Sequence, residues 1–270
     1  MRKSNSNKTM YSVLMLVCIV VFWAFENFYT PDTYSSKDSN GLKEALPAYV
    51  VPSSTTGDIV EHSYYSLSYN EPYEQAEWVA YALHKKDLTS DDRKRPYFIE
   101  DPKVKTKSAD WRNYKGSGYD RGHLCPAGDR RFSKQAYNET FYTSNISPQN
   151  RDFNAGVWNR LEMKTRYWAK KYGSIFVITG GILKRGLPEI GDEDIAVPNY
   201  FYKIIARGDE KNLKAVAFIM ENKESSVPIK EFLVPIDVIE KETGIDFFKE
   251  LSEKNQSKIE AKVSDRDWKF

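Results

Sequence analysis

The sequence contains very little cysteine and histidine. Its 270 residues include two Cys and three His. Cys18 lies in an apolar run near the N-terminus, so a disulfide with Cys125 is not expected if that run is embedded in a membrane or cleaved off. A domain of this size can fold without a disulfide. Because there is no CxxC or HExxH motif, the sequence also offers no zinc site rich in Cys or His.

The chain lacks a strong overall charge and has no internal repeat. It has 40 Lys and Arg against 38 Asp and Glu, which gives a net charge of +2. The charge is uneven, however, because residues 101–171 contain 15 Lys and Arg and only 7 Asp and Glu. A basic central segment in a nearly neutral chain is typical of a groove that binds a polyanion. Charged helix faces are also common, so this pattern only supports other signals.

The N-terminus carries the one long uncharged run. Residues 1–9 are polar and basic, and residues 10–25 contain no charged side chain. This order is typical of a signal peptide or a signal anchor. No A-x-A-like cleavage site follows, so we favour an uncleaved anchor, with a cleaved signal and a buried core helix as alternatives. The basic end is expected to stay inside, with the rest of the chain exported.

The remaining chain divides by composition into a polar spacer over residues 26–58 and a domain over residues 59–270. The spacer is rich in Ser, Thr, Pro, Asp and Asn and has no clear periodicity. In the domain, alternating or apolar runs predict strands. These runs are residues 62–69, 174–179, 200–206 and 213–220, with residues 78–84 readable as a strand or a helical turn.

Helical spacing and end signals predict four helices in the domain. Ser133 resembles the N-cap of a short helix through Asn138, and Asn154 opens a helix to about Tyr172 that Gly173 ends. Two more are predicted over residues 235–243 and 246–251, and residues 141–146 are predicted to be extended. The elements together predict an α+β domain with a mainly antiparallel sheet.

The chemistry concentrates in residues 119–162. His123 stands in the run DRGH, a second run reads SNISPQ, and Asn154, Trp158 and Glu162 follow at helical spacing. Attack of water on a phosphodiester needs a neutral imidazole to accept the proton near pH 7. It also needs a cation to neutralise the phosphate oxygens. This stretch supplies candidates for the base and for a ligand of the cation.

These runs resemble the DNA/RNA non-specific endonuclease family, the ββα-metal (His-Me finger) nucleases with a DRGH signature. DRGH alone is a weak signal, but DRGH followed by SNISPQ and by Asn154, Trp158 and Glu162 in register is a strong one. The resemblance covers the motif tightly and most of residues 60–270 more loosely. It implies a ββα-metal fold, with His123 as general base and Asn154 as the ligand of Mg²⁺, for which Mn²⁺ is an alternative.

Other residues have candidate roles and ordinary alternatives. Glu162 lies eight residues after Asn154, about 80° round an ideal helix, and is a candidate to hold a water on the metal. It is equally placed to pair with Arg166 on the surface. Asn145 is a candidate to orient His123 or to contact the metal's water, or simply to satisfy a turn. Cys125 is read as a small buried residue rather than a reactive thiol.

Arginines are the candidates for binding phosphate, because a guanidinium fork matches phosphate oxygens. The resemblance implies phosphate contact for Arg121, and Arg95 and Arg160 are weaker candidates that could be solvated surface charges. The sequence therefore predicts an exported, Mg²⁺-dependent endonuclease that binds DNA and RNA through the phosphate backbone and a membrane through its N-terminal run. A silent nucleic-acid-binding module and a phosphodiesterase for a small or lipid substrate remain the alternatives.

Overall fold

The computed structural model describes residues 4–31, 34 and 45–270. The chain divides into two units, Met1–Asp32 and Thr33–Phe270. In the first unit, helix α1 (Ser4–Phe28) contains the stretch Asn7–Phe25, 19 residues with a mean hydropathy of 1.9. Length and composition alone would allow this stretch to cross a membrane.

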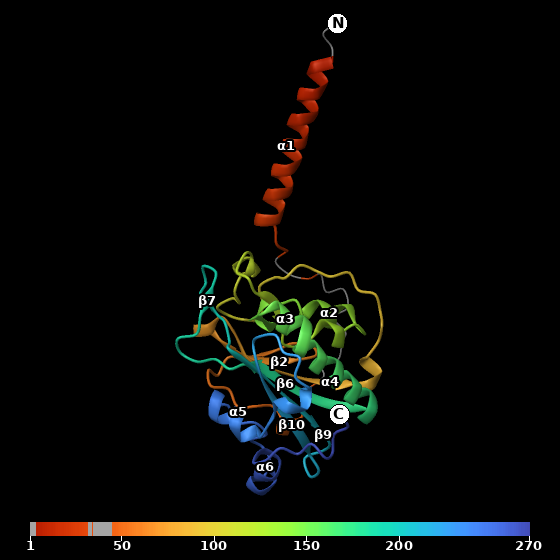
Figure 1. The fold of residues 1–270 in the computed structure, drawn as a ribbon, viewed down its shortest axis with the longest axis vertical. Coiled ribbons are helices and arrows are strands. Elements are labelled where there is room, and N and C mark those ends of the chain that lie inside the picture. The colour runs from red at the N-terminus through yellow and green to blue at the C-terminus, as the bar shows by residue number, and fades with distance from the viewer. Residues whose placement is uncertain (1–3, 32–33, 35–44) are drawn as a thin grey trace. The chain divides into compact units, whose positions relative to one another are not determined.

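The second unit is built on a seven-stranded antiparallel sheet in the order β1-β2-β3-β6-β9-β10-β11 (Figure 1). Most of these strands are rich in apolar and β-branched residues, which suit a sheet covered on both faces. The strands are β1 (Ile59–Glu61), β2 (Ser66–Asn70), β3 (Gln75–His84), β6 (Ser174–Gly181), β9 (Tyr200–Arg207), β10 (Lys214–Glu221) and β11 (Leu233–Val234).

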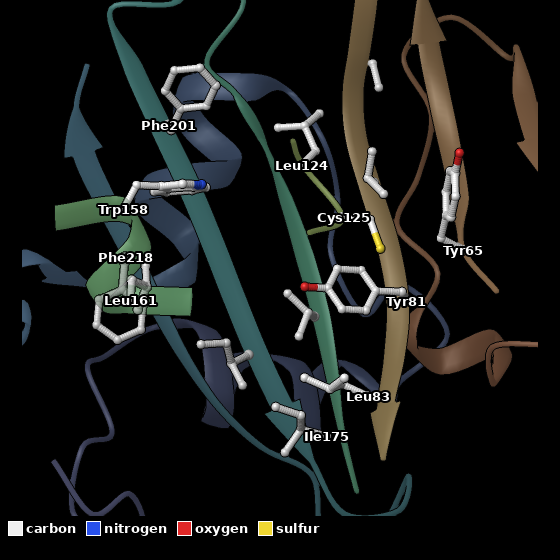
Figure 2. Packing of buried hydrophobic residues seen from close by; sticks show 14 of the residues in the cluster. Tyr65, Tyr81, Leu83, Leu124, Cys125, Trp158, Leu161, Ile175, Phe201 and Phe218 are labelled. Carbon is white, nitrogen blue, oxygen red and sulfur yellow. The ribbon is translucent and has the colours of Figure 1, made fainter. Parts of the chain in front are cut away.

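Each face of the sheet is covered by different helices because side chains alternate along every strand. On β9, Phe201 and Ile205 pack in one core cluster with α4 (Asn159–Tyr172), whereas Tyr202 and Ile204 pack in another with α5 (Ile236–Thr243). Helix α6 (Glu253–Glu260) lies on the α5 side and contacts both α5 and β10. Figure 2 shows Trp158 and Leu161 from the helical side facing Phe201 and Phe218.

The segment between β3 and β6 leaves the sheet and returns to the same place. His84 and Ser174 are register partners, and the Lys85 N–H donates to the Gly173 carbonyl at 2.8 Å. Within this segment, β4 (Asp120–His123) and β5 (Ile146–Gln149) form a separate antiparallel pair. A helical run follows, through α3 (Arg151–Phe153), a π-helical turn (Asn154–Trp158) and α4. The result is a ββα unit inserted between two adjacent strands.

The helical run of this unit is interrupted at its start. The Asn150 side chain caps it by accepting from the N–H groups of Asp152 and Phe153. Gly156 then has non-helical angles of φ −98° and ψ −107° inside the π-helical turn. Such turns are often found at functional sites. At the other end, Gly173 at φ 88° stops α4, as predicted.

Smaller elements complete the unit. Helix α2 (Lys134–Glu139) is capped by the Ser133 hydroxyl, as predicted. Strands β7 (Glu189–Ile190) and β8 (Ile195–Ala196) form a short hairpin. Short 3₁₀ turns are Ala48–Val50, Glu71–Tyr73, Lys85–Asp87, Trp111–Tyr114, Ala127–Asp129, Thr143–Asn145 and Ile229–Phe232.

Three predicted elements differ from the structure. The strand expected over residues 62–69 is present only from Ser66, because the chain turns between Glu61 and its register partner Ser66. Residues 141–146 are not extended throughout, since 3₁₀ turn Thr143–Asn145 occupies half of them. No helix forms over residues 246–251, where Phe248 has a positive φ of 54° that interrupts helical geometry. The other predicted strands and helices are present with ends shifted by a few residues.

Residues 45–58, expected to belong to the spacer, pack against the domain. Val50 is fully buried in the core cluster on the α5 side. The Ser53 carbonyl accepts from Trp78 Nε1 at 2.8 Å, and the Thr55 N–H donates to Glu77 Oε1 at 2.9 Å. Residues 32, 33 and 35–44 of the predicted spacer lie outside the described residues. The packed part of the chain therefore begins before residue 59.

Two truncations test this boundary. A protein without residues 1–58 should be less stable than one without residues 1–44 by about 3 kcal/mol or more. The reason is that Val50 leaves the core, and Trp78 and Glu77 lose buried partners. Urea unfolding of the two proteins measures the difference. Equal unfolding midpoints and slopes would show that residues 45–58 contribute nothing to stability.

Candidate active site

His123, the last residue of β4, is held between aromatic rings. Its ring centroid lies 5.6 Å from that of Phe98 and 5.0 Å from that of Phe141. The side chain is partly exposed, but Nε2 is buried and has no hydrogen-bond partner in the described part of the chain. Burial lowers the pKa of His123 to about 3, and the positive charges of Arg95 and Arg121 add to the effect. The imidazole is therefore neutral at physiological pH, as a general base must be.

Two arginines stand around the same rings. The Arg121 guanidinium lies over Phe98 at 4.7 Å from the centroid, and Arg95 lies over the same ring at 5.3 Å. Neither forms an ion pair within the described residues. Burial and the neighbouring Arg95 lower the pKa of Arg121. The charge of Asp120 opposes this fall. Two like charges held together with no ion pair among the described residues favour the binding of an anion.

Asn154 faces β4 from the start of the helical run. Its Nδ2 donates to Asp120 Oδ2 at 3.0 Å. With the amide nitrogen engaged in this way, the Asn154 Oδ1 is left to accept or to bind a cation. Amide and carboxylate oxygens are the ligands that Mg²⁺ prefers, so Asn154 with Asp120 fits such an ion. Asp120 was not predicted as a site residue, although it is the first residue of the DRGH run.

Gly122 is required by a close approach of the neighbouring strand. A Cβ at this position would lie 2.2 Å from the side-chain carboxamide carbon of Gln149 on β5. No real Cβ tolerates such a contact, so any larger residue would push β4 away from β5 or displace the buried Gln149. Since His123 is the next residue, the glycine fixes where the imidazole stands.

Asn145 does not contact His123 with its side chain. It is fully buried, and Nδ2 donates to the carbonyls of Cys125 and Thr140 at 3.0 and 2.9 Å. Its Oδ1 accepts from the Cys125 N–H at 2.8 Å. The side chain therefore binds the backbone just after the DRGH strand, which matches the predicted alternative of satisfying a turn. Any effect on His123 passes through that backbone.

Glu162 takes part in a buried ion network. Arg166 donates to Glu162 Oε2 at 3.2 Å and to Asp129 Oδ1 at 2.5 Å. Burial raises the pKa of Glu162, and the charges of Arg166 and Lys203 oppose the rise. The predicted Glu162–Arg166 pair is thus present, and it is mostly buried, since the Glu162 side chain is 14% exposed. The π-helical turn between Asn154 and Glu162 replaces the regular helix from which the 80° separation was expected.

Lys203 was missed by sequence reasoning. It stands at an apolar position of β9, between Phe201 and Ile205, and is 1% exposed. Its Nζ lies 4.6 Å from the centroid of the Trp158 ring and has no hydrogen-bond partner among the described residues. Burial lowers the pKa of Lys203, and Glu162 and Asp129 oppose the fall. The one signal in the sequence is a lysine inside an otherwise apolar strand.

The remaining candidates have structural contacts. Arg160 donates to the backbone carbonyls of Ser225 and Val227 at 2.7 and 3.2 Å, which joins α4 to the loop after β10. His62 is buried and shares a hydrogen bond with Asp101 at 2.7 Å. Cys125 is fully buried among residues that include Tyr65 and Tyr81 (Figure 2), and burial raises the pKa of its thiol to about 12. It is therefore an inert packing residue, as predicted.

The β4–β5 pair and the helical run together present a neutral histidine and an asparagine oxygen. This arrangement defines the class of ββα-metal nucleases. The chain belongs to the DNA/RNA non-specific endonuclease family, whose model matches residues 43–254. The predicted family and fold class are thereby confirmed. The match begins ahead of the expected domain start at residue 59, in agreement with the packing of residues 45–58.

Relatives named as nucleases come from animals and fungi. The chain is 36% identical over 226 residues to Nuclease EXOG, mitochondrial, of Xenopus laevis, covering 77% of this chain and 63% of the relative. It is 34% identical over 206 residues to human Endonuclease G, mitochondrial, covering 68% and 67%. With Nuclease C1 of Cunninghamella echinulata it shares 36% identity over 218 residues, covering 73% and 85%. This chain thus spans under two thirds of the Xenopus relative.

A solved structure has the same fold. The chain superposes on a crystal structure of the EndoG/EndoGI complex, described as showing the mechanism of EndoG inhibition, with a TM-score of 0.69 and 29% identity. The superposition covers 83% of this chain and 96% of that one. The sheet and the ββα unit are therefore those of an EndoG-like protein.

Replacing Asn145 should lower the stability of the fold more than replacing Asn154. Asn145→Ala should lower the free energy of unfolding by about 3 kcal/mol or more, because three buried backbone groups lose their partners. Asn154→Ala should lower it by under about 1 kcal/mol, since Asn154 is partly exposed and makes one side-chain hydrogen bond. Chemical denaturation of both variants without metal measures this. Equal losses would contradict the distinction between a buried backbone clamp and a site residue.

Acid should destabilise the native protein through His123. Its pKa in the folded state, about 3, lies below the ordinary 6.5, so the unfolded chain takes up the proton first as pH falls. Stability is therefore lost between pH 6.5 and 3, by about 1–2 kcal/mol at pH 5. Unfolding of the parent and of His123→Gln at pH 8 and pH 5 tests this, since the variant lacks the titrating group. An unchanged difference between the two proteins at both pH values would refute the shift.

Proposed function

We propose that this chain is an exported, Mg²⁺-dependent endonuclease that hydrolyses phosphodiester bonds of DNA and RNA with little sequence preference. The observation that carries the proposal is the neutral His123 beside two unpaired guanidinium groups, with the Asn154 amide on the same ββα unit. Family membership and the names of the relatives support the same activity.

His123 would accept the proton of the attacking water. Its pKa is low in the free protein partly because Arg95 and Arg121 are positive. When substrate phosphates pair with these guanidinium groups, their effect on the imidazole is reduced and the histidine becomes more basic. Substrate binding would therefore bring the base closer to the pKa that proton transfer needs near neutral pH.

Asn154, held by Asp120, would bind Mg²⁺ through its amide oxygen. The bound ion would neutralise charge on the phosphate and on the departing oxygen. Glu162, fixed by Arg166, would orient water near the ion, as groups behind the direct ligands commonly do. Arg121 and Arg95 would hold the phosphate and stabilise the charge that builds in the transition state. The family resemblance further implies products with 5′-phosphate and 3′-hydroxyl ends.

Little sequence preference follows from what these groups can contact. Guanidinium groups and a metal ion bind phosphates, which carry no direct sequence information. The sequence contains no recognisable base-reading helix or zinc finger. Arg95 and Arg121 lie over the Phe98 ring, which also contacts His123, and there they would meet the backbone of any nucleic acid.

The N-terminal helix would place the enzyme at a membrane. The stretch Asn7–Phe25 is apolar enough to span one, and the basic residues before it would remain inside. The nuclease domain would then lie on the extracytoplasmic side, or be released if the segment is cleaved. Several relatives are named as mitochondrial proteins.

Plasmid and RNA digestion with the full chain tests the proposal. The parent should cleave unrelated sequences alike with Mg²⁺ and lose activity in EDTA. His123→Ala should lose about 10²- to 10⁴-fold in rate while still binding DNA, because it lacks the base and keeps the arginines. His84→Ala, on β3 in the sheet, is the matched histidine control and should keep its rate.

Three outcomes would reject the mechanism or the function. Normal turnover by a folded His123→Ala protein would remove His123 as the base. Binding of DNA without cleavage by the parent would indicate a nucleic-acid-binding module. Hydrolysis of a small or lipid phosphodiester without cleavage of nucleic acid would indicate a different phosphodiesterase.

A further inference from the structure

A second cluster of acidic side chains lies on the face of the sheet opposite to α4. Asp237 and Glu240 are three residues apart on α5, and Glu260 is the last residue of α6. One carboxylate oxygen from each residue lies within 4.8 Å of the other two. The cluster therefore joins α5 and α6.

Glu260 is buried in this cluster with one carboxylate oxygen unsatisfied. The residue is 4% exposed, and its Oε1 has no hydrogen-bond partner in the described part of the chain. Burial, with the negative charges of Glu240, Asp237 and Asp246, raises the pKa of Glu260 to about 8, against a hydrogen bond from Gln256 that lowers it. A buried carboxylate oxygen with no donor is costly unless a cation or a proton satisfies it.

No basic side chain neutralises the cluster. Among the described residues, no lysine or arginine forms an ion pair with Asp237, Glu240, Asp246 or Glu260. Glu240 Oε1 accepts from the Phe247 N–H at 2.8 Å, and Asp246 Oδ1 accepts from Gln256 at 2.7 Å. Those two contacts fix the positions of the carboxylates but add no positive charge.

We propose that Asp237, Glu240 and Glu260 bind a divalent cation, Ca²⁺, at a site separate from the nuclease centre. Calcium takes carboxylate oxygens at 2.3–2.6 Å in flexible geometry, so oxygens on opposite sides of one ion lie roughly 4.6–5.2 Å apart. The separation of up to 4.8 Å in the cluster matches that span without movement of either helix. Asp237 is exposed, which leaves room for water to complete the shell.

The ion would act as a clamp between α5 and α6. Helix α6 is mostly polar, and its Ile259 is only partly buried against the core. An ion that binds the folded protein and not the unfolded chain stabilises the fold in proportion to its concentration. With three carboxylates and an open side, the site belongs with calcium sites whose Kd is on the order of 10⁻⁴–10⁻³ M.

Calcium titration of the full chain tests the site. Asn154→Ala serves as the background, so that the nuclease centre contributes no metal binding. Calorimetry with Ca²⁺ alone should show one bound ion, and Ca²⁺ at millimolar concentration should raise the thermal midpoint. Glu260→Gln and Asp237→Asn in this background should weaken binding about ten-fold or more and remove the rise. Glu253→Gln, an exposed residue of the same helix, is the matched control and should keep both.

Two results would overturn the proposal. The first is an Asn154→Ala protein that binds no Ca²⁺ and shows no rise in its thermal midpoint. The second is a Glu260→Gln or Asp237→Asn protein that binds Ca²⁺ as tightly as the background. Ca²⁺ could also leave the stability of both the parent and Glu260→Gln unchanged while Glu260→Gln is the more stable protein. That outcome would likewise overturn the proposal and would mean that Glu260 carries a proton instead.

Discussion

The position of His123 depends on how the strand that carries it ends. Immediately after His123, the backbone of Leu124 and Cys125 is bound by a single residue. The Asn145 carbonyl accepts from the Leu124 N–H. The Asn145 side chain accepts from the Cys125 N–H and donates to the Cys125 carbonyl. These bonds are buried, so breaking them exposes unsatisfied groups to an apolar interior. The β4–β5 pair, the rings around the imidazole and the start of the helical run all depend on this fixed end.

A second constraint is the burial of charge between α4 and the sheet. Asp129, Glu162, Arg166 and Lys203 are oppositely charged groups in or at the edge of an apolar layer that includes Trp158. Removing one partner from such a set leaves a buried charge uncompensated, which is strongly destabilising. The network therefore holds Glu162 in one place and ties α4 to Lys203 on β9 of the sheet.

The sequence was informative where short-range signals decide the structure. Alternation and apolar runs located the sheet strands, Ser133 and Gly173 marked helix ends, and DRGH with Asn154 located the ββα unit. Prediction from the sequence failed where contacts between residues far apart in the chain decide the structure. Nothing local shows that Val50 enters the core, that Asn145 binds Cys125, or that Asp129 meets Arg166. The π-helical turn at Gly156 also changed the angle between Asn154 and Glu162, and a regular helix had been assumed. The roles of the site residues remain predictions.

The insertion of the ββα unit between β3 and β6 has a consequence for synthesis of the chain. Strand β3 is buried over nearly all its length, and its second neighbour, β6, begins ninety residues after β3 ends. While residues 85–173 are being made, the three-stranded sheet of β1, β2 and β3 has an unpaired, largely apolar edge. Such an edge is a template for pairing with other chains. Closing a loop of that length costs about 4 kcal/mol of chain entropy, so early compaction of the ββα unit would shorten the time for which the edge stays open.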